Sequence, residues 1–216
     1  MSARERILER VRAALGAGPE HGPALPALPP LPADAAAGAP RTMPDDDLVA
    51  RFAARLLAVG GEFLDPGHNA ADAIAERLAA QAVRTVALGG GDELRAVAAA
   101  LQRRGIVCLP PTAVPADLFA ADAGVTMAQW GIAETGTIVL DADAATARAA
   151  SLVPPLHVAL LPRSRVLPDL DAALAVLPQP VPHAVTLVTG PSRTADIELQ
   201  LVVGVHGPRA LIVVFT

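Results

Sequence analysis

A short segment with glycine at both ends carries the first set of side chains that could do chemistry. Gly131–Thr137 reads GIAETGT and stands between two apolar stretches. Glycine permits backbone conformations closed to other residues, so amides and side chains of the loop can turn toward a ligand. The pattern predicts Glu134 as an acid, base or nucleophile, with the hydroxyls of Thr135 and Thr137 binding substrate. The alternative is a tight turn whose polar side chains satisfy its own backbone.

A second candidate segment, Thr189–Glu198, follows a strand predicted over Ala184–Val188. Open α/β sheets place their ligands at the carboxyl ends of strands. Exposed amides here, with Arg193 beside them and Ser192 or Thr194 capping a following helical turn, suit a carboxylate or phosphate. Two acidic residues of the same segment oppose a highly charged anion, so a monocarboxylate is the expected guest. The alternative is a capped turn that holds no ligand.

Arg148 and His206 complete the candidate site residues. Arg148 precedes the segment Ser151–His157, and a guanidinium there can clamp an anion; the alternative is a solvated charge. His206 lies in the turn Val205–Pro208 and is predicted as a second catalytic group, because imidazole titrates near neutral pH. His157 opens an apolar strand, where we expect a histidine of the core.

The residue inventory excludes several other kinds of chemistry. Cys108 is the only cysteine, in an apolar setting typical of a buried strand, and all 17 basic residues are arginine. One thiol cannot ligate an iron–sulfur cluster or structural zinc unaided, and a Schiff-base or phosphate-loop lysine is impossible. Gly89–Gly91 does not match G-x-G-x-x-G, and the acidic pair Asp92 and Glu93 opposes a pyrophosphate. We predict no metal site and no cofactor bound by this chain.

Composition narrows the class of protein further. Of 216 residues 52% are hydrophobic and 18% charged, which excludes disorder throughout the chain. A net charge of −5, 2% aromatic residues and no tyrosine give neither a basic surface nor a stacking platform, so nucleic acid is not an expected partner. Without a signal-like segment or an apolar run of roughly 18 residues, we expect a cytoplasmic protein with no membrane span.

Two regions are predicted along the chain. Residues 1–44 combine an N-terminal amphipathic helix with a Pro/Ala-rich linker. Residues 45–216 alternate short apolar runs with helical patterns, which predicts a three-layer α/β domain with a largely parallel sheet. Val125–Gln129 and Thr137–Asp141 look like strands without a helix between them, so a hairpin excursion is expected there.

Four segments together resemble the LUD-domain family of lactate utilisation proteins, most closely its C-type subunit. They are Gly131–Thr137, Arg148 with Ser151–His157, Thr189–Glu198 and Gly204–Pro208, in the order and at the spacing of the family. The resemblance extends from about residue 45 to the last residue. It implies a fold similar to the ribose-5-phosphate isomerase and CoA-transferase group. It also implies a role in oxidising L-lactate to pyruvate, as one of three cytoplasmic subunits in a complex.

The residue types of this chain agree with a role as one subunit of a complex in which other subunits carry the redox cofactors. Lactate oxidation moves two electrons, and this chain offers no cluster ligands, dinucleotide loop or lysine. The electron carrier must then come from elsewhere. The family resemblance implies iron–sulfur clusters on partner subunits, while this chain would bind a small carboxylate such as L-lactate.

Two other function classes stay open. One is a stand-alone isomerase or CoA-transferase-like enzyme on the same fold, with Glu134 as the acyl acceptor. The missing lysine counts against the isomerase, because phosphate sites recruit positive charge and only arginine could supply it here. The other is a non-catalytic interaction subunit whose loops are merely structural.

Overall fold

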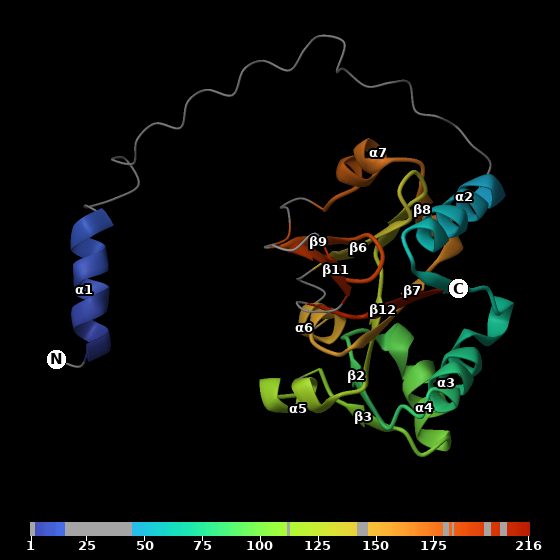
Figure 1. Cartoon of the computed structure of the whole chain (residues 1–216), viewed down its shortest axis with the longest axis horizontal. Coiled ribbons are helices and arrows are strands. Elements are labelled where there is room, and N and C mark those ends of the chain that lie inside the picture. The colour runs from blue at the N-terminus through green and yellow to red at the C-terminus, as the bar shows by residue number, and fades with distance from the viewer. Residues whose placement is uncertain are drawn as a thin grey trace, which may run out of the picture. The chain divides into compact units, whose positions relative to one another are not determined.

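The fold is described from a computed structural model, which covers residues 3–15, 45–111, 113–141, 147–178, 182, 184–196, 200–203 and 207–216 (Figure 1). The chain divides into two compact units, Met1–Gly38 and Ala39–Thr216. The first unit contains helix α1 (Ala3–Leu15), with Glu5 in its first turn and Arg12 in its last. These charges complement the helix dipole. The exposed Ile7 and Leu8 are apolar residues of the amphipathic pattern.

Within the described ranges, six parallel strands form the central sheet of the second unit. They are β1 (Glu62–Leu64), β2 (Thr85–Leu88), β3 (Val107–Leu109), β4 (Ala123–Met127), β7 (Leu156–Leu161) and β12 (Ala210–Phe215). Their order is β1-β12-β7-β4-β2-β3. Every residue of β7 is buried, as expected for a central parallel strand covered on both faces. The predicted α/β class with a largely parallel sheet is confirmed.

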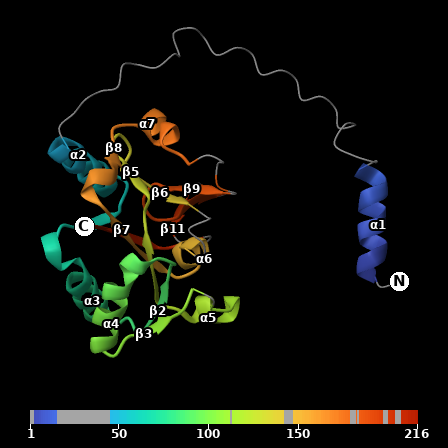
Figure 2. The ribbon, with the colours of Figure 1, turned by 180° about the vertical axis from the view of Figure 1, so that it is seen from behind.

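Helices cover both faces of this sheet, and Figures 1 and 2 show them from opposite sides. One face packs against α3 (Ala70–Ala80) and α4 (Arg95–Arg103), whose apolar residues join those of the strands in one core cluster. The other face packs against α2 (Asp45–Ala58) and a second sheet. There the rings of Phe52 and Phe215 pack edge to face, with their centroids 5.8 Å apart. Shorter helices α5 (Pro115–Ala120) and α6 (Ala147–Leu152) contribute to a third cluster over β2.

The second sheet is the predicted hairpin excursion. Its described strands are β5 (Trp130–Ile132), β6 (Thr137–Asp141), β8 (Val166–Leu167) and β9 (Val185–Val188), in the order β8-β5-β6-β9. The hairpin consists of antiparallel β5 and β6. Most of the other predicted strand, Val125–Gln129, is indeed a strand, but it belongs to β4 of the main sheet, so its assignment to the hairpin was wrong. Helix α7 (Leu170–Ala175) follows β8, and Asp169 caps it by accepting a hydrogen bond from the amide of Ala172 at 2.9 Å.

An antiparallel ribbon replaces the helical turn expected after Ser192. Strand β10 (Arg193–Asp196) pairs with β11 (Gln200–Val203), and Thr194 lies opposite Val202. The predicted capping of a helical turn by Ser192 or Thr194 is therefore wrong, because strand pairing engages this backbone instead. Along the described part of the chain, no helix is long and apolar enough to cross a bilayer.

Helix α2 ends in a glycine motif that leaves one carbonyl pointing away from the helix. The amide of Gly61 bonds to the carbonyl of Leu56, and the amide of Gly60 bonds to that of Leu57, both at 2.9 Å. Gly60 has a φ of +86°, which a glycine adopts without strain. Because neither bond uses the carbonyl of Val59, this group can accept a hydrogen bond from another part of the fold.

Candidate functional site

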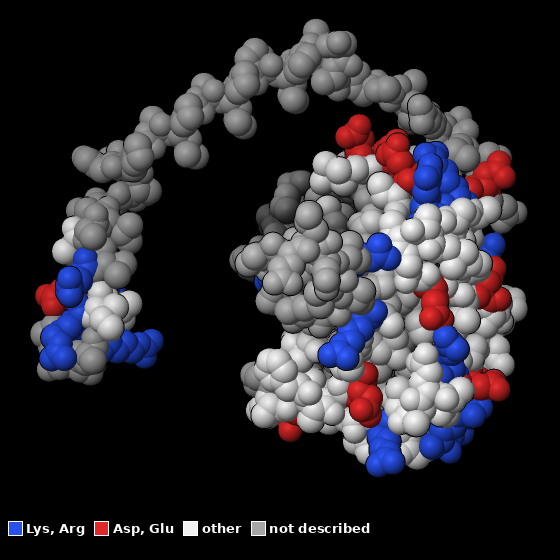
Figure 3. All heavy atoms as spheres, in the orientation of Figure 1, with Lys and Arg blue, Asp and Glu red and all other residues white. Residues whose placement is uncertain are grey.

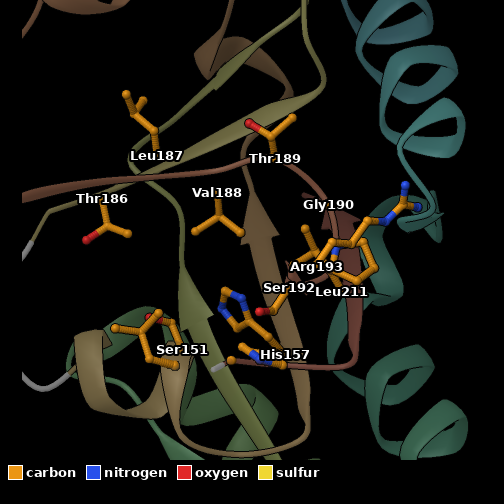
Figure 4. A pocket seen from close by; sticks show the side chains of 14 residues that line it. Ser151, His157, Thr186, Leu187, Val188, Thr189, Gly190, Ser192, Arg193 and Leu211 are labelled. Carbon is orange, nitrogen blue, oxygen red and sulfur yellow. The ribbon is translucent and has the colours of Figure 1, made fainter. Parts of the chain in front are cut away.

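A pocket of about 300 Å³ opens between the two sheets (Figure 4). One wall comes from the first residues of β7 and β12, through His157 and Leu211. The opposite wall is β9 with the loop that follows it. The end of α6 and the turn at Gly207 and Pro208 close the sides. Hydroxyl-bearing residues are prominent in the lining: Ser151, Thr186, Thr189 and Ser192.

This pocket is not at the edge of the sheet where we expected it. The prediction applied the rule for open parallel sheets to the strand before Thr189. That strand, β9, instead pairs antiparallel with β6 in the second sheet. The pocket therefore borders the amino ends of β7 and β12 and the carboxyl end of β9. The segment after β9 lines the pocket, but the rule for open parallel sheets does not apply to it.

His157 is a buried polar residue of the pocket wall. Its side chain is 0% exposed, and Nε2 lies 2.9 Å from Oγ1 of Thr126, a buried residue of the neighbouring strand β4. Among the described residues, Nδ1 has no hydrogen-bond partner. Burial lowers the pKa of His157 from 6.5 to about 4, so the ring is neutral at pH 7. The expected core histidine is thus buried, but it also borders the pocket.

Ser151 reaches the pocket because α6 packs directly on the sheet. A Cβ at Gly124 would overlap the carbonyl oxygen of Ala150, so only glycine admits the helix at this distance. Ser151 is 1% exposed, and its Oγ donates to the carbonyl of Arg148 at 2.9 Å. The Arg148 side chain is exposed and does not belong to the described pocket lining.

Ser192 and Arg193, both predicted to bind substrate, line the pocket, but part of their hydrogen-bonding capacity is already used. The amide of Ser192 donates to the carbonyl of Pro208 at 2.9 Å. Arg193 donates from Nη2 to the carbonyl of Val59 at 2.7 Å. Figure 4 shows the Arg193 side chain directed to the end of α2, whereas the His157 ring and Ser192 hydroxyl face a common space in this view. Thr194 belongs to β10, but its side chain is not among those that the structure describes.

A chain of hydroxyl groups connects the GIAETGT segment to the pocket. Thr135 Oγ1 and Thr137 Oγ1 are 2.6 Å apart, and Thr137 Oγ1 lies 2.7 Å from Oγ1 of Thr189. Thr189 lines the pocket, while Thr137 is 4% exposed and stands one step behind it. The structure therefore brings two of the predicted threonines to the edge of the site, without placing either in the described lining.

Glu134 points to a different part of the molecule. It lies in the β5–β6 turn, half exposed, with Oε1 4.0 Å from Nη2 of Arg51 on α2. Gly136 of the same turn packs against the backbone of α2, where a Cβ would clash at Leu56. Glu134 is not among the described pocket-lining residues. The other predicted catalytic residue, His206, lies outside the described residues.

Acidic and basic side chains of the described residues do not form separate patches on the face drawn in Figure 3 but are interspersed. Exposed ion pairs account for some of them: Arg77–Glu62, Arg95–Asp92, Arg103–Asp72 and Arg163–Asp65. Such pairs typically contribute about 0–1 kcal/mol each. Arg193 is the charged residue of the described pocket lining.

The described residues contain no group of three or more His, Cys, Asp or Glu that could hold a metal ion. Cys108 stands on β3, at the edge of the central sheet, and is only partly buried. The strand that carries it was expected to be buried, but β3 is partly exposed, because an edge strand is covered less completely than a central one. Burial still raises the pKa of the Cys108 thiol, which disfavours the thiolate that binds metals.

The chain is similar in sequence to a known protein family and to individual proteins. The LUD domain family model matches residues 95–216. Two proteins called lactate utilization protein C, from Bacillus licheniformis and Bacillus subtilis, are 42% and 39% identical to it over 94 residues. Each match covers 41% of this chain and 39% of the relative. The chain therefore matches about two fifths of the length of these relatives.

A solved structure gives a longer match. A DUF162 family protein from Deinococcus radiodurans is 26% identical, with a TM-score of 0.60, over 81% of this chain and 99% of that one. The structural match thus extends beyond the segment found by the sequence comparisons. The family model, the relatives and this neighbour agree with the resemblance carried by the four sequence segments, and the chain belongs to the LUD-domain family.

Proposed function

We propose that this chain acts in lactate utilisation, as a subunit of a cytoplasmic complex that oxidises L-lactate to pyruvate. The observation that carries the proposal is its similarity of 39–42% identity to proteins called lactate utilization protein C. The hydroxyl-lined pocket with Arg193 beside it supports the proposal, because a monocarboxylate needs few polar partners and little positive charge. In this role the chain binds the substrate and contributes no redox cofactor.

The residues of this chain do not fit an iron–sulfur cluster. Such clusters are usually held by several cysteine thiolates, and Cys108 is the only cysteine of the sequence. We place the clusters on partner subunits, where they would accept the two electrons of lactate oxidation. The pocket of this chain would then hold the carboxylate while the partner supplies the electron acceptor.

Genetic deletion tests the proposed role. In a strain without other lactate dehydrogenases, deleting the gene should abolish growth on L-lactate and leave growth on pyruvate intact, because only the oxidation step is lost. Re-expression of the full chain should restore growth. Normal growth of the deletion strain on L-lactate would overturn the proposal.

Affinity purification tests complex membership separately. The full chain, tagged and isolated from lactate-grown cells, should bring down an iron-containing, cysteine-rich protein. A preparation without iron or such a partner would leave the chain outside the proposed complex.

The stand-alone acyl-transfer alternative finds less support in the geometry. It requires Glu134 in the substrate pocket, but this carboxylate lies beside Arg51 on α2. Mass spectrometry after incubation with acyl-CoA would detect an adduct on Glu134, and its presence would favour the transferase.

A further inference from the structure

His157 carries a polar atom whose partner is absent from the described protein. The residue is 0% exposed, and its Nδ1 has no hydrogen-bond partner among the described residues. Burying such an atom without a partner is unfavourable, and native structures retain few such groups. The ring borders the pocket, and the pocket is therefore the space from which a ligand atom could reach it.

Thr126 decides which nitrogen of the neutral ring carries the hydrogen. Its hydroxyl contacts Nε2 of His157 at 2.9 Å, and only one of these two atoms can donate. If Nε2 donated, both the hydroxyl hydrogen of Thr126 and the Nδ1 lone pair would lack partners among the described residues. If Thr126 donates, only the Nδ1–H group is left without one. The second arrangement leaves fewer buried groups unsatisfied, so Nδ1 is assigned as a donor.

An N–H donor at the pocket wall is complemented by a hydrogen-bond acceptor on a ligand. Carboxylate, carbonyl and hydroxyl oxygens are acceptors. A 2-oxocarboxylate carries a carboxylate beside a carbonyl, and a 2-hydroxycarboxylate carries a carboxylate beside a hydroxyl. Ser192 and Thr186 add hydroxyl groups to the same pocket. Arg193 is positively charged, but Nη2 is bonded to Val59, so this guanidinium can balance a single negative charge better than several.

We propose that His157 is a ligand-binding residue whose Nδ1–H donates to an oxygen of a small 2-hydroxy- or 2-oxocarboxylate, with Thr126 fixing the ring. The choice of L-lactate and pyruvate as probes rests on the proposed function. The assignment of His157 itself rests on the burial, the Thr126 contact and the position at the pocket.

Nitrogen NMR of the full chain labelled with ¹⁵N-histidine tests this directly. The His157 signals, identified by their loss in His157→Gln, should show hydrogen on Nδ1 at pH 7. Addition of L-lactate or pyruvate should shift the Nδ1 signal. Thr126→Val should change the balance of the two ring tautomers, an effect that a purely structural threonine would not produce.

Calorimetry with matched variants measures the contribution of each nitrogen. Glutamine places its amide near the position of Nε2 and asparagine near that of Nδ1. His157→Gln should therefore weaken carboxylate binding roughly 10-fold or more, because a hydrogen bond to a charged group is lost, while His157→Asn should retain part of the affinity. The exposed His68 lies outside the described pocket lining, so His68→Gln should bind like the wild type.

The outcomes separate this proposal from the proposed function. If lactate binds but the His157 signals do not move and His157→Gln binds equally well, the assignment of His157 is overturned and the lactate role is untouched. If acetate or inorganic phosphate shifts Nδ1 while lactate and pyruvate do not, His157 is supported as a ligand-binding residue, but the proposed ligand class is overturned and the lactate role loses support. If no carboxylate shifts Nδ1 in the wild type at millimolar concentration, the site is overturned, whatever the deletion strain does.

Discussion

Arg193 donates a hydrogen bond from Nη2 to the main-chain carbonyl of Val59, 2.7 Å away, and so joins strand β10 to the end of helix α2. The acceptor is the carbonyl that the Gly60–Gly61 motif leaves outside the helix. A cation at the carboxyl end of a helix is also favoured by the helix dipole. A residue predicted only as a substrate-binding group therefore also connects the pocket to the core helix.

Arg193→Ala should lower the free energy of unfolding by about 1 kcal/mol, a value reduced by the exposure of the side chain. Urea unfolding measures this, and Arg193→Lys should recover part of the loss because an ammonium group can still donate. Equal stability of the alanine variant and the wild type would show that the bond contributes nothing. Calorimetry with L-lactate on the same variants separates a role in binding from the role in stability.

Two helix ends offer a matched pair of backbone tests. Helices α3 and α4 both end with paired amide-to-carbonyl bonds, and the residue in the left-handed conformation is Ala82 (φ 57°) in one and Gly105 (φ 74°) in the other. Ala82→Gly should raise the free energy of unfolding by roughly 0.5–1 kcal/mol, because glycine adopts this conformation without strain. Gly105→Ala should lower the free energy of unfolding by a similar amount, because alanine is strained in the left-handed conformation. A Cβ at Gly105 meets no atom within 4 Å, so this strain is the only cost expected. Urea unfolding should therefore give changes of opposite sign in the free energy of unfolding for the two variants. Changes of the same sign would contradict this explanation.

Gly124→Ala tests the close approach of α6 to the sheet. The added Cβ would overlap the carbonyl of Ala150, a backbone atom that cannot rotate away. We expect a loss of roughly 1–3 kcal/mol in the free energy of unfolding, larger than that of the open-site control Gly105→Ala. Because Ser151 follows Ala150, carboxylate binding should weaken as well. A cost no greater than that of the control would mean that α6 shifts freely.

The stability of the protein should depend on pH through His157. Burial lowers the pKa of this residue to about 4, against 6.5 in the unfolded chain, so between these pH values the unfolded state binds more protons. The contribution of His157 to stability is fully present above pH 6.5 and is lost as the pH falls toward 4, by roughly 3 kcal/mol.

Urea unfolding of the wild type and His157→Gln from pH 7 to pH 4 isolates this contribution. The advantage of the wild type should shrink as the pH falls, because the variant has no imidazole to protonate. Parallel stability profiles of the two proteins would contradict the prediction.

Glu134→Gln should have a small effect on both stability and pocket binding. Its partner Arg51 is 4.0 Å away and both side chains are partly exposed, so we expect a change below about 0.5 kcal/mol in the free energy of unfolding. Calorimetry should find unchanged affinity for L-lactate. If the variant protein binds lactate normally but a strain that carries it no longer grows on lactate, the result would instead support the catalytic role predicted from the sequence.

The longer elements were predictable because their sequences carry enough residues to show a period. The apolar run at Leu156–Leu161 and the helical stripes of α3 and α4 each correspond to an element of the structure. Shorter pieces were missed, including α5, α6 and β5, because three to six residues cannot separate a helical period from an alternating one. The polar loops were also visible in the sequence, since glycine and hydroxyl residues interrupt apolar runs there.

The class of fold, the family and the reactions that one cysteine and no lysine cannot perform were predictable from the sequence, because they follow from residue types and their order. Which polar groups meet depends on the tertiary structure. The ring of His157 meets Thr126 because β7 lies beside β4, which places the two side chains within hydrogen-bond distance. Glu134 is turned toward α2 because the β5–β6 turn packs on that helix. Such contacts join residues far apart in the chain, and local spacing carries no information about them.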